Sequence, residues 1–319
     1  MKAAIVRAFD RAPEYGDIAA PVAGDGEVLV STSAAALSQL VRAQAAGRHY
    51  SSGRELPLVP GADGVGRLAD GQRVYFAFPR APIGAMAEQV AVRCAQCIPV
   101  PDAVDDVTAA AIANPGMSSL AALEHRAQFK PGETVLINGA AGTSGRLAIQ
   151  IARQLGASRV VGTARNAVVE AELRELGLDA FISLQQEPEA LTAAFRQEMQ
   201  GHGVNVVLDY LWGAPAECII AAAAGHGSSA AEPAIRFVNI GSLAGATLPL
   251  NAGNLRGSGL ALTGSGLGSV SHEALVQCVG KLLQWVKSAG LKVDTLAVPL
   301  AQVTQAWAQQ TSARIVLTL

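Results

Sequence analysis

The stretch ETVLINGAAGTSGRLAIQIARQLG, residues 133–156, decides the fold of this chain. The apolar run at 135–137 is typical of a buried strand, and apolar residues from Leu147 to Leu155 then recur at helical spacing. Between the two stand glycines at every third position: Gly139, Gly142 and Gly145. The period of the pattern changes at these glycines. The sequence therefore predicts a strand, a glycine-rich turn and a helix.

Such a turn between a strand and a helix is typical of a dinucleotide cradle. Without a Cβ, Gly139 permits a tight turn, Gly142 permits close approach of a pyrophosphate, and Gly145 lets the helix pack on its strand. The N-terminus of the helix then offers unpaired N–H donors to the phosphates. No Lys-Ser/Thr pair follows, which argues against a P-loop, and an ordinary loop is the alternative. The residues expected to bind phosphate are Gly139, Gly142, Thr143, Ser144 and Gly145.

Length and composition favour a globular chain of more than one domain. The chain has 319 residues, half of them hydrophobic, against roughly 100–200 residues for one domain. Its apolar runs end well before the ~20 residues of a membrane helix. Arg7 and Asp10 interrupt the N-terminal stretch where a signal peptide would be apolar. With a formal net charge of -2 there is no basic footprint for nucleic acid. We expect an unprocessed cytoplasmic protein that binds neither membrane nor nucleic acid.

Cysteine and histidine spacing gives little indication of a metal site. Cys94 and Cys97 form a Cys-x-x-Cys pair, but no second pair or nearby histidine completes four zinc ligands. The plainer interpretation is two cysteines on a strand. The four cysteines are too scattered for a disulfide framework, which indicates a reducing compartment. The histidines are interpreted as structural or surface residues, with the exception of His49.

Strand and helix signals divide the chain. Short strands separated by turn residues are expected at 3–6, 27–32, 64–68, 73–77 and 87–92. Helices at 109–113 and 118–128 precede strands that alternate with helices, at 134–138, 159–163, 180–183, 204–209, 235–240 and 259–263. This alternation predicts a parallel, doubly wound sheet. The final strand, helix and strand, at 296–300, 303–310 and 314–319, are expected to return to the first domain, and residues 225–232 to form a mobile surface loop.

The strand after the phosphate helix, in the stretch RVVGTARN at 159–166, indicates the cofactor. An acid often ends this strand and binds the adenosine ribose, but here no carboxylate precedes Glu170. Arg165 can form a charge-assisted bond to a 2′-phosphate; a solvated surface arginine is the alternative. NADPH is therefore favoured over NADH, with Thr163, Arg165 and Asn166 beside the ribose.

Several short motifs, spread along nearly the whole chain, match the motifs of a known superfamily in their order and spacing. They are LPLVPGADGVGR at 56–67, GAMAEQVAV at 84–92, ANPGMSSLAAL at 113–123, the glycine loop with its helix, 204–209, Asn239–Gly241 and Gly264–Gly266. Together they resemble the medium-chain dehydrogenase/reductase superfamily, in particular its zinc-independent quinone oxidoreductase branch.

The resemblance implies an α/β protein in which a GroES-like, mostly β catalytic domain clasps a Rossmann domain, with the active site in the cleft. We expect the N-terminal part of the catalytic domain at 1–113, the Rossmann dinucleotide-binding domain at 114–288 and the return to the catalytic domain at 289–319. Homodimers are usual in this branch, so a homodimer is expected.

The resemblance also implies that catalytic zinc is absent. Zinc-dependent relatives carry Gly-His-Glu where this chain has Gly61-Ala62-Asp63, a ligand cysteine in the region of 38–42, and a cysteine-rich lobe that this chain lacks. Quinone-branch relatives commonly show Asn-Pro and an aspartate before an Arg-x-Gly stretch, and Ser38 takes the usual asparagine position. Tyr50, or His49 if the alignment slips by one, falls where relatives place a tyrosine at the mouth of the pocket.

Without a metal, hydride transfer depends on holding the nicotinamide C4 against the acceptor and excluding water. The acceptor must already be electron-poor, such as a quinone, an α,β-unsaturated ketone or an activated carbonyl. The candidate proton donors are Tyr50, His49, Ser38 or water. No tyrosine has a lysine four positions later, so the tyrosine–lysine pair of short-chain reductases is not available.

Other residues are expected around the nicotinamide. In relatives the stretch with Asn114 and Met117 approaches the nicotinamide and substrate; otherwise Asn114 caps a helix. Strand ends at the carboxyl edge of the sheet are expected to hold the nicotinamide ribose and carboxamide, or else to be simple turns: Ile240, Gly241, Ser242, Ser265 and Gly266. The expected apolar walls are Phe78, Met117 and Leu267.

The leading hypothesis is an NADPH-dependent, metal-independent reductase of quinones or enones. A second enzyme hypothesis is a reductase of ketones or of acyl-thioester double bonds on the same scaffold. A hypothesis of another class is an NADPH-binding sensor or structural protein without catalysis, which the departure from the Asn-Pro-x-Asp pattern leaves open.

Overall fold

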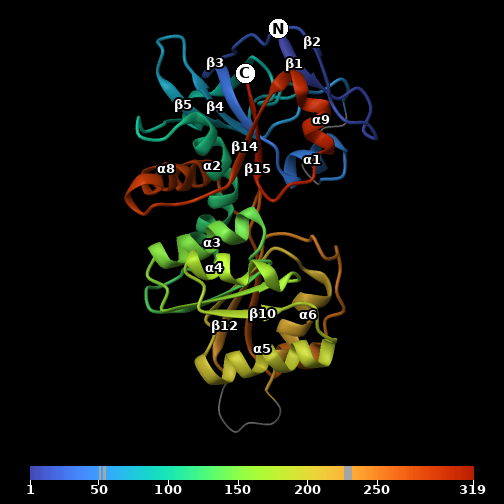
Figure 1. The fold of residues 1–319 in the computed structure, drawn as a ribbon, viewed down its shortest axis with the longest axis vertical. Coiled ribbons are helices and arrows are strands. Elements are labelled where there is room, and N and C mark those ends of the chain that lie inside the picture. The colour runs from blue at the N-terminus through green and yellow to red at the C-terminus, as the bar shows by residue number, and fades with distance from the viewer. Residues whose placement is uncertain (50–51, 53–54, 226–231) are drawn as a thin grey trace. The chain divides into compact units, whose positions relative to one another are not determined.

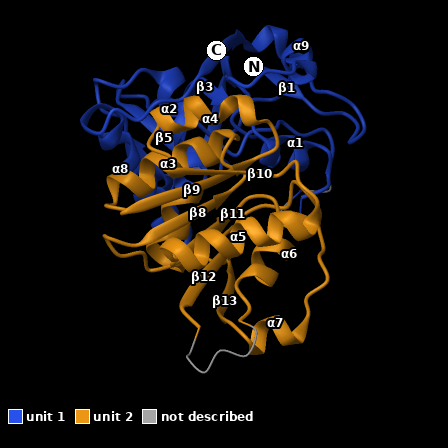
Figure 2. Ribbon diagram, turned by 60° about the horizontal axis from the view of Figure 1, so that its bottom comes forward, with its two compact units in different colours: residues 1–117, 271–319 blue, residues 118–270 orange. Residues whose placement is uncertain are grey.

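A computed structural model describes residues 1–49, 52, 55–225 and 232–319. Tyr50 and most of the loop expected at 225–232 lie outside these described residues. The chain forms two compact units: unit 1 comprises Met1–Met117 and Ser271–Leu319, and unit 2 comprises Ser118–Val270 (Figure 2).

A parallel sheet is the centre of unit 2. Its strands lie in the order β10 (Ala180–Ser183), β9 (Arg159–Ala164), β8 (Thr134–Asn138), β11 (Val206–Asp209), β12 (Ala234–Asn239) and β13 (Gly259–Gly264). Each neighbouring pair is parallel. Counted from β8, this is the 3-2-1-4-5-6 order of a Rossmann fold, whose strand order reverses between β8 and β11.

Helices cover both faces of this sheet. They are α3 (Thr143–Gln154), α4 (Glu170–Glu175), α5 (Pro188–His202) and α6 (Gly213–Ala222). A short 3-10 turn η3 (Ala167–Val169) and the short exposed helix α7 (Ala252–Arg256) complete the helical elements between the strands. Figures 1 and 2 show α3 and α4 on one face and α5 and α6 on the other. Leu147 and Ile151 of α3 are fully buried, as their helical spacing predicts. The other face packs through a cluster that includes Phe195, Ile219 and Phe237.

Unit 1 is mostly β. One sheet has the order β14 (Thr295–Pro299), β15 (Arg314–Thr318), β3 (Glu27–Ala36), β4 (Asp63–Arg67), β5 (Arg73–Ala77) and β7 (Cys97–Pro99), with β6 (Gln89–Arg93) also paired to β3. β1 (Lys2–Ile5) and β2 (Glu14–Asp17) form a separate antiparallel pair. Besides α2 (Asp106–Ala121), which begins in this unit, its helical elements are α1 (Gln39–Ala45), η1 (Cys94–Gln96), α8 (His272–Ser288), η4 (Leu300–Gln302) and α9 (Val303–Ala308). The expected fold class, a mostly β domain plus a doubly wound parallel sheet, is confirmed.

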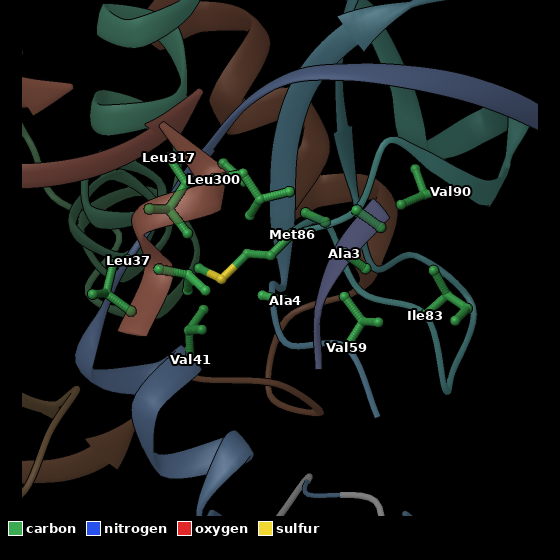
Figure 3. Close-up of a cluster of buried hydrophobic side chains, with 14 of the residues drawn as sticks. Ala3, Ala4, Leu37, Val41, Val59, Ile83, Met86, Val90, Leu300 and Leu317 are labelled. Atoms are coloured by element: carbon green, nitrogen blue, oxygen red, sulfur yellow. The ribbon is translucent and has the colours of Figure 1, made fainter. Parts of the chain in front are cut away.

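The core of unit 1 joins the two ends of the chain. Ala3 and Ala4 of β1 pack in one buried cluster with Leu300 and Leu317 from the C-terminal segment. The Met86 side chain, fully buried, extends toward Leu37 within this cluster (Figure 3). Because apolar burial stabilises by roughly 25 cal/mol per Å², these side chains hold the C-terminal segment to β1, while β15 pairs with β3 in the sheet.

The helix after β7 differs from its expected form. α2 runs without a break over Asp106–Ala121, through Pro115, and continues as a π-helical turn η2 over Ala122–Arg126. The expected division into 109–113 and 118–128 is therefore wrong. Asp105 caps the helix by accepting from the Thr108 N–H at 2.9 Å, and Asn114, in the interior of α2, does not cap it. A proline inside a helix costs about 3 kcal/mol, which the full burial of the neighbouring residues 109–113 offsets.

Among the described residues, no helix combines the length and the apolar character needed to cross a membrane.

Candidate functional site

Two of the three glycines in the loop after β8 are required by geometry. Gly139 has φ +97°, a conformation that favours glycine, and a Cβ there would lie 3.1 Å from the Leu211 side chain. A Cβ on Gly145 would lie 2.4 Å from the Gly139 carbonyl oxygen and 2.6 Å from the Ala140 Cα. Since those atoms are backbone, they cannot move aside cheaply. The turn at Gly139 and the packing of α3 against it therefore fix each other.

The third glycine leaves a helix end open. Gly142 is the N-cap of α3 and provides no side-chain hydrogen bond to the first turn. A Cβ at Gly142 would have only the Gly139 oxygen near it, at 3.8 Å, so the protein leaves space there. The N–H groups of the first turn of a helix lack intrahelical partners and attract anions. Thr143 and Ser144, which follow Gly142, begin this turn.

Arg146 also holds the loop, and the sequence analysis did not single it out. Its Nε donates to the Ala141 carbonyl oxygen at 3.0 Å, and its Nη2 donates to Glu172 of α4 at 2.9 Å. The only signal in the sequence was an arginine in the first turn of a helix, where a cation is usually unfavourable. The salt bridge to Glu172 balances that charge and fastens the loop to α4.

The expected cofactor segments of unit 2 lie along one edge of the sheet. Because the strands are parallel, their carboxyl ends meet at the same edge. Backbone hydrogen bonds link neighbouring ends: Ala140 N to Thr163 O, 2.8 Å; Tyr210 N to Asn138 O, 3.1 Å; Gly241 N to Asp209 O, 3.1 Å; and Ser265 N to Asn239 O, 2.8 Å. The glycine loop, the end of β9 and the turns after β12 and β13 are thus neighbours at this edge.

The residues expected beside the adenosine ribose differ in exposure. Thr163 is fully buried, and its Oγ1 accepts from Gly139 N at 3.0 Å and donates to Asn138 Oδ1 at 2.8 Å. Thr163 therefore shapes the glycine turn through its side chain. Arg165 and Asn166 are exposed. Asn166 caps η3 by accepting from Val168 N at 3.0 Å, which leaves Arg165 as the exposed cation at the end of β9.

The turns expected near the nicotinamide are tightly built. A Cβ on Gly241 would lie 2.7 Å from the Tyr210 carbonyl oxygen, so this glycine allows the turn after β12 to pass close to the turn after β11. Ile240 N donates to Asp209 O at 2.7 Å, whereas Ser242 is exposed. After β13, Ser265 is half-buried. The Gly266 N–H donates a hydrogen bond of 2.8 Å to the Ser269 hydroxyl oxygen, which closes the turn. Leu267 is half-buried and forms a bridge to Val270.

A buried carboxylate lies where the ends of β8, β11 and β12 meet. Asp209 is fully buried and accepts hydrogen bonds from the Asn138 and Asn239 side chains, at 2.8 and 3.1 Å. It also accepts from the backbone N–H groups of Leu211 and Trp212, each at 3.1 Å. Burial raises the pKa of Asp209, and these hydrogen bonds oppose the rise. Sequence reasoning included Asp209 only as the end of a strand.

The substrate-side residues of unit 1 have defined local roles. Ser38 is buried and caps α1 by accepting from Val41 N at 3.0 Å, so its O–H remains able to donate. Phe78 has φ 55°, unusual for a residue other than glycine, and stacks on His272 with ring centroids 4.2 Å apart. Asn114 is half-buried and Met117 is buried in α2. Burial lowers the pKa of His49.

The segment that in zinc-dependent relatives carries Gly-His-Glu also has a defined geometry. Gly61 has φ +119°, Ala62 offers no ligand atom, and Asp63 begins β4. Asp63 is buried and accepts from the Tyr75 hydroxyl at 3.1 Å. Burial raises the pKa of Asp63 to about 6, against the attraction of Arg314 and the hydrogen bond from Tyr75. The carboxyl group is thus committed to partners within unit 1.

The chain is similar to known oxidoreductases in sequence and in structure. A family model described as "Zinc-binding dehydrogenase" matches residues 145–288. A probable NADPH-dependent quinone reductase of Emericella nidulans is 27% identical over 354 residues, covering 96% of each chain. Prostaglandin reductase-3 of Mus musculus is 28% identical over 73% of this chain and 60% of its own. A quinone oxidoreductase structure from Thermus thermophilus, also described in complex with NADPH, has a TM-score of 0.79 and 26% identity, with both chains fully covered.

A Rossmann sheet with a glycine-loop dinucleotide edge, joined in one chain to a mostly β unit, defines a two-domain nucleotide-dependent oxidoreductase fold. Over its full length the chain is similar to proteins described as quinone reductases and quinone oxidoreductases, and its residues 145–288 match the zinc-binding dehydrogenase family.

Proposed function

We propose that this protein is an NADPH-dependent, metal-independent oxidoreductase that transfers hydride to an electron-poor acceptor, a quinone or an α,β-unsaturated carbonyl compound. The observation that carries the proposal is the loop after β8. It places an uncapped helix N-terminus at Gly142 beside the point where the strand order of the sheet reverses. Dinucleotides bind open α/β sheets at this point, with the pyrophosphate on the helix N-terminus.

The exposed guanidinium of Arg165 supports NADPH as the cofactor. It follows β9 directly, and no carboxylate lies in the sequence between it and Glu170. An arginine favours a 2′-phosphate, whereas an acid would repel it. The names of the Emericella nidulans and Thermus thermophilus relatives, which refer to NADPH, agree with this choice.

The donor set supports a metal-independent reaction. Ala62 replaces the histidine of the Gly-His-Glu motif, and Asp63 is bonded to Tyr75. The match to the zinc-binding dehydrogenase family covers residues 145–288 and does not include this segment. Bound NADPH supplies the hydride. The chain then has to orient the acceptor, exclude water and deliver a proton, and Ser38 retains a hydroxyl hydrogen that its capping bond does not use.

The proposed residues fall into three groups. The proposed cofactor residues are Gly139, Gly142, Thr143, Ser144, Gly145, Thr163, Arg165, Asn166, Ile240, Gly241, Ser242, Ser265 and Gly266. The proposed catalytic residues are Tyr50, Ser38 and Asn114, and the proposed substrate contacts are Tyr50, Phe78, Met117 and Leu267. The domain boundaries proposed on the family pattern, 1–113, 114–288 and 289–319, differ from the compact units, since unit 1 resumes at Ser271 whereas the family match ends at 288.

We further propose a cytoplasmic homodimer. Among the described residues β13 is the last strand in the order of its sheet and pairs with β12 on one side. The outer edge of such a strand carries backbone groups that can pair with a second chain.

Binding calorimetry of the purified protein with NADPH and with NADH tests the cofactor. Arg165→Glu is expected to weaken NADPH binding at least tenfold, about 1.4 kcal/mol, and to weaken NADH binding much less. The matched control is Arg256→Glu, which makes the same charge change at an exposed residue of α7, before the amino end of β13. Equal weakening of both cofactors by Arg165→Glu would remove the argument for NADPH.

Turnover with an acceptor panel at fixed NADPH tests the reaction. Reduction of 1,4-quinones or 2-enones is expected to exceed reduction of simple ketones. Preference for ketones or for acyl-thioester double bonds would favour the second enzyme hypothesis. Tight NADPH binding without turnover on any acceptor would favour the sensor or structural hypothesis. If neither cofactor binds, the proposed function is wrong.

A further inference from the structure

We propose that Asp209 is a positioning residue for the dinucleotide: it aligns the strand ends on both sides of the sheet's switch point and, through Asn138 and Thr163, sets the turn at Gly139. This inference rests on the proposed function. It concerns a fully buried side chain that is expected to act without touching the cofactor.

Asp209 ends β11, beside the switch point of the sheet. β8 begins one half of the Rossmann order and β11 begins the other, so the two halves meet between these strands. The Asn138–Asp209 side-chain bond of 2.8 Å spans this junction at its carboxyl end. On its other side, Asp209 accepts from the Asn239 side chain at the end of β12. One carboxylate therefore joins three strand ends at the edge where dinucleotides bind.

A directional chain of hydrogen bonds leads from Asp209 to the glycine loop. Asn138 donates through Nδ2 to Asp209, so its Oδ1 accepts from the Thr163 hydroxyl at 2.8 Å. Because the hydroxyl hydrogen of Thr163 is used in this way, its oxygen lone pair accepts from Gly139 N at 3.0 Å. Each group has one role that satisfies its neighbours. The direction of the whole chain is set by Asp209, which as a carboxylate only accepts.

Asp209 also holds the turn after β11. Trp212 has φ 56° and ψ −158°, a backbone region almost restricted to glycine, where conformations persist only when their surroundings impose them. The Asp209 carboxylate accepts from the N–H groups of Leu211 and Trp212 and so holds this turn. The Leu211 side chain in turn packs at Gly139, 3.1 Å from where a Cβ would be. Asp209 thus reaches the glycine loop by a hydrogen-bond chain and by a packed, strained turn.

Isosteric replacement of Asp209 should disturb the cofactor edge selectively. In Asp209→Asn, one carboxylate oxygen becomes an NH2 group that faces N–H donors from the backbone or from a neighbouring asparagine. If the amide introduced by Asp209→Asn flips by 180°, its NH2 group faces the other set of N–H donors, so one set always loses its acceptor. The turn at Gly139 and the turn at Trp212 would then lose their common acceptor, and the N–H groups aimed at the pyrophosphate would be displaced.

The experiment measures the dissociation constant for NADPH, the KM for NADPH and kcat for the full-length protein, together with its Tm. Asp209→Asn is expected to raise the dissociation constant and KM about tenfold or more, while kcat at saturating NADPH changes much less. Thr163→Val, which removes the hydroxyl that links Asn138 to Gly139, should raise them about threefold, since it removes one neutral hydrogen-bonded group. The matched control is Asp179→Asn, whose carboxylate accepts from Val160 N at the amino end of β9 and pairs with Arg153. It should lower Tm and leave NADPH binding within twofold.

The outcomes separate this inference from the proposed function. If the wild-type protein binds neither NADPH nor NADH, the proposed function fails. If the wild-type protein binds NADPH and both Asp209→Asn and Thr163→Val bind it equally well, Asp209 is a structural residue only and the inference is overturned. Should Asp209→Asn fail to fold, Thr163→Val alone decides between these results. Weakened binding in Asp179→Asn as well would also overturn the inference, because any loss of stability would then produce the effect.

Discussion

Each unit buries an aspartate, at the start of a strand in unit 1 and at the end of a strand in unit 2. Different groups surround the two carboxylates. Asp63, the first residue of β4 in unit 1, is 4% exposed, and Asp209, the last residue of β11 in unit 2, is 0% exposed. Asp63 accepts from the Tyr75 hydroxyl and lies in the field of Arg314. Asp209 accepts N–H groups from two side chains and from the following turn. Burial alone therefore does not define what a carboxylate does; the number and kind of donors around it do.

The difference appears in the cost of ionisation. Burial raises the pKa of Asp63 to about 6, and burial lowers the pKa of Arg314 to about 10. Among the described residues, Arg314 Nε has no hydrogen-bond partner, so this pair is incompletely solvated. At Asp209 the N–H donors replace much of the hydrogen bonding to water that burial removes, and so they stabilise the charged form of the carboxylate.

The largest expected effect is on stability at neutral pH. Asp209→Asn should lower the free energy of unfolding by about 4 kcal/mol, because buried N–H donors lose a charged acceptor. Asp63→Asn should cost less, about 2 kcal/mol: the amide oxygen can still accept from Tyr75 and a carboxylate that is costly to ionise is removed, but the buried Arg314 loses its counter-charge. Urea unfolding at pH 7 measures both. Equal losses would break the contrast between the two sites.

The second effect is the pH dependence of stability that Asp63 contributes. Its pKa of about 6 in the folded protein lies above about 3.9 for an unfolded aspartate, so the folded protein binds the proton more tightly. The stability of the wild type relative to Asp63→Asn should therefore be greatest below about pH 4. It should fall by about 3 kcal/mol as the pH rises through 6, and then remain constant. Unfolding curves at several pH values give this difference, and a flat difference would contradict the assignment.

A smaller effect is expected from Tyr75→Phe. The hydroxyl stabilises the Asp63 carboxylate, so its loss should raise the pKa of Asp63 further and lower stability by about 2 kcal/mol at pH 8, as for a hydrogen bond to a charged group. The loss should be smaller at pH 4, where Asp63 is neutral. An NMR titration of the Asp63 carboxyl carbon measures the shift directly. An unchanged pKa would mean that the Tyr75 bond adds nothing to the solvation of this site.

The smallest effect is expected from the matched tyrosine of unit 2. The Tyr210 hydroxyl lies 2.8 Å from the Ser119 hydroxyl, and burial raises the pKa of Tyr210 well above its ordinary value. Tyr210→Phe should therefore cost about 1 kcal/mol, as for a neutral pair, equally at pH 5 and pH 8. If the stability lost in Tyr210→Phe depended on pH, the contrast between a tyrosine with a neutral partner and one with an ionisable partner would be wrong.

Local sequence patterns determined a large part of the fold. The bounds of β5, β8 and β10 agree with those expected from apolar runs, because a short buried strand is a contiguous signal. The glycine loop could be located for the same reason, since its strand, turn and helix are consecutive. The continuation of α2 through Pro115 could not be foreseen, because the burial that offsets a proline comes from elements distant in sequence.

The sequence by itself determined the strand, glycine turn and helix at 133–156 and predicted the glycines and the cation, Arg165, of the proposed dinucleotide edge. Only the tertiary structure decided how that edge is held. Asn138 and Asp209 are 71 positions apart, and Asp63 and Arg314 come from opposite ends of the chain. Their donors, acceptors and charges acquire partners only when parallel strands or the two chain ends are brought together. The period of apolar residues predicts which face of a helix or strand is buried. A hydrogen-bond network depends on which strands become neighbours, and the whole fold decides this.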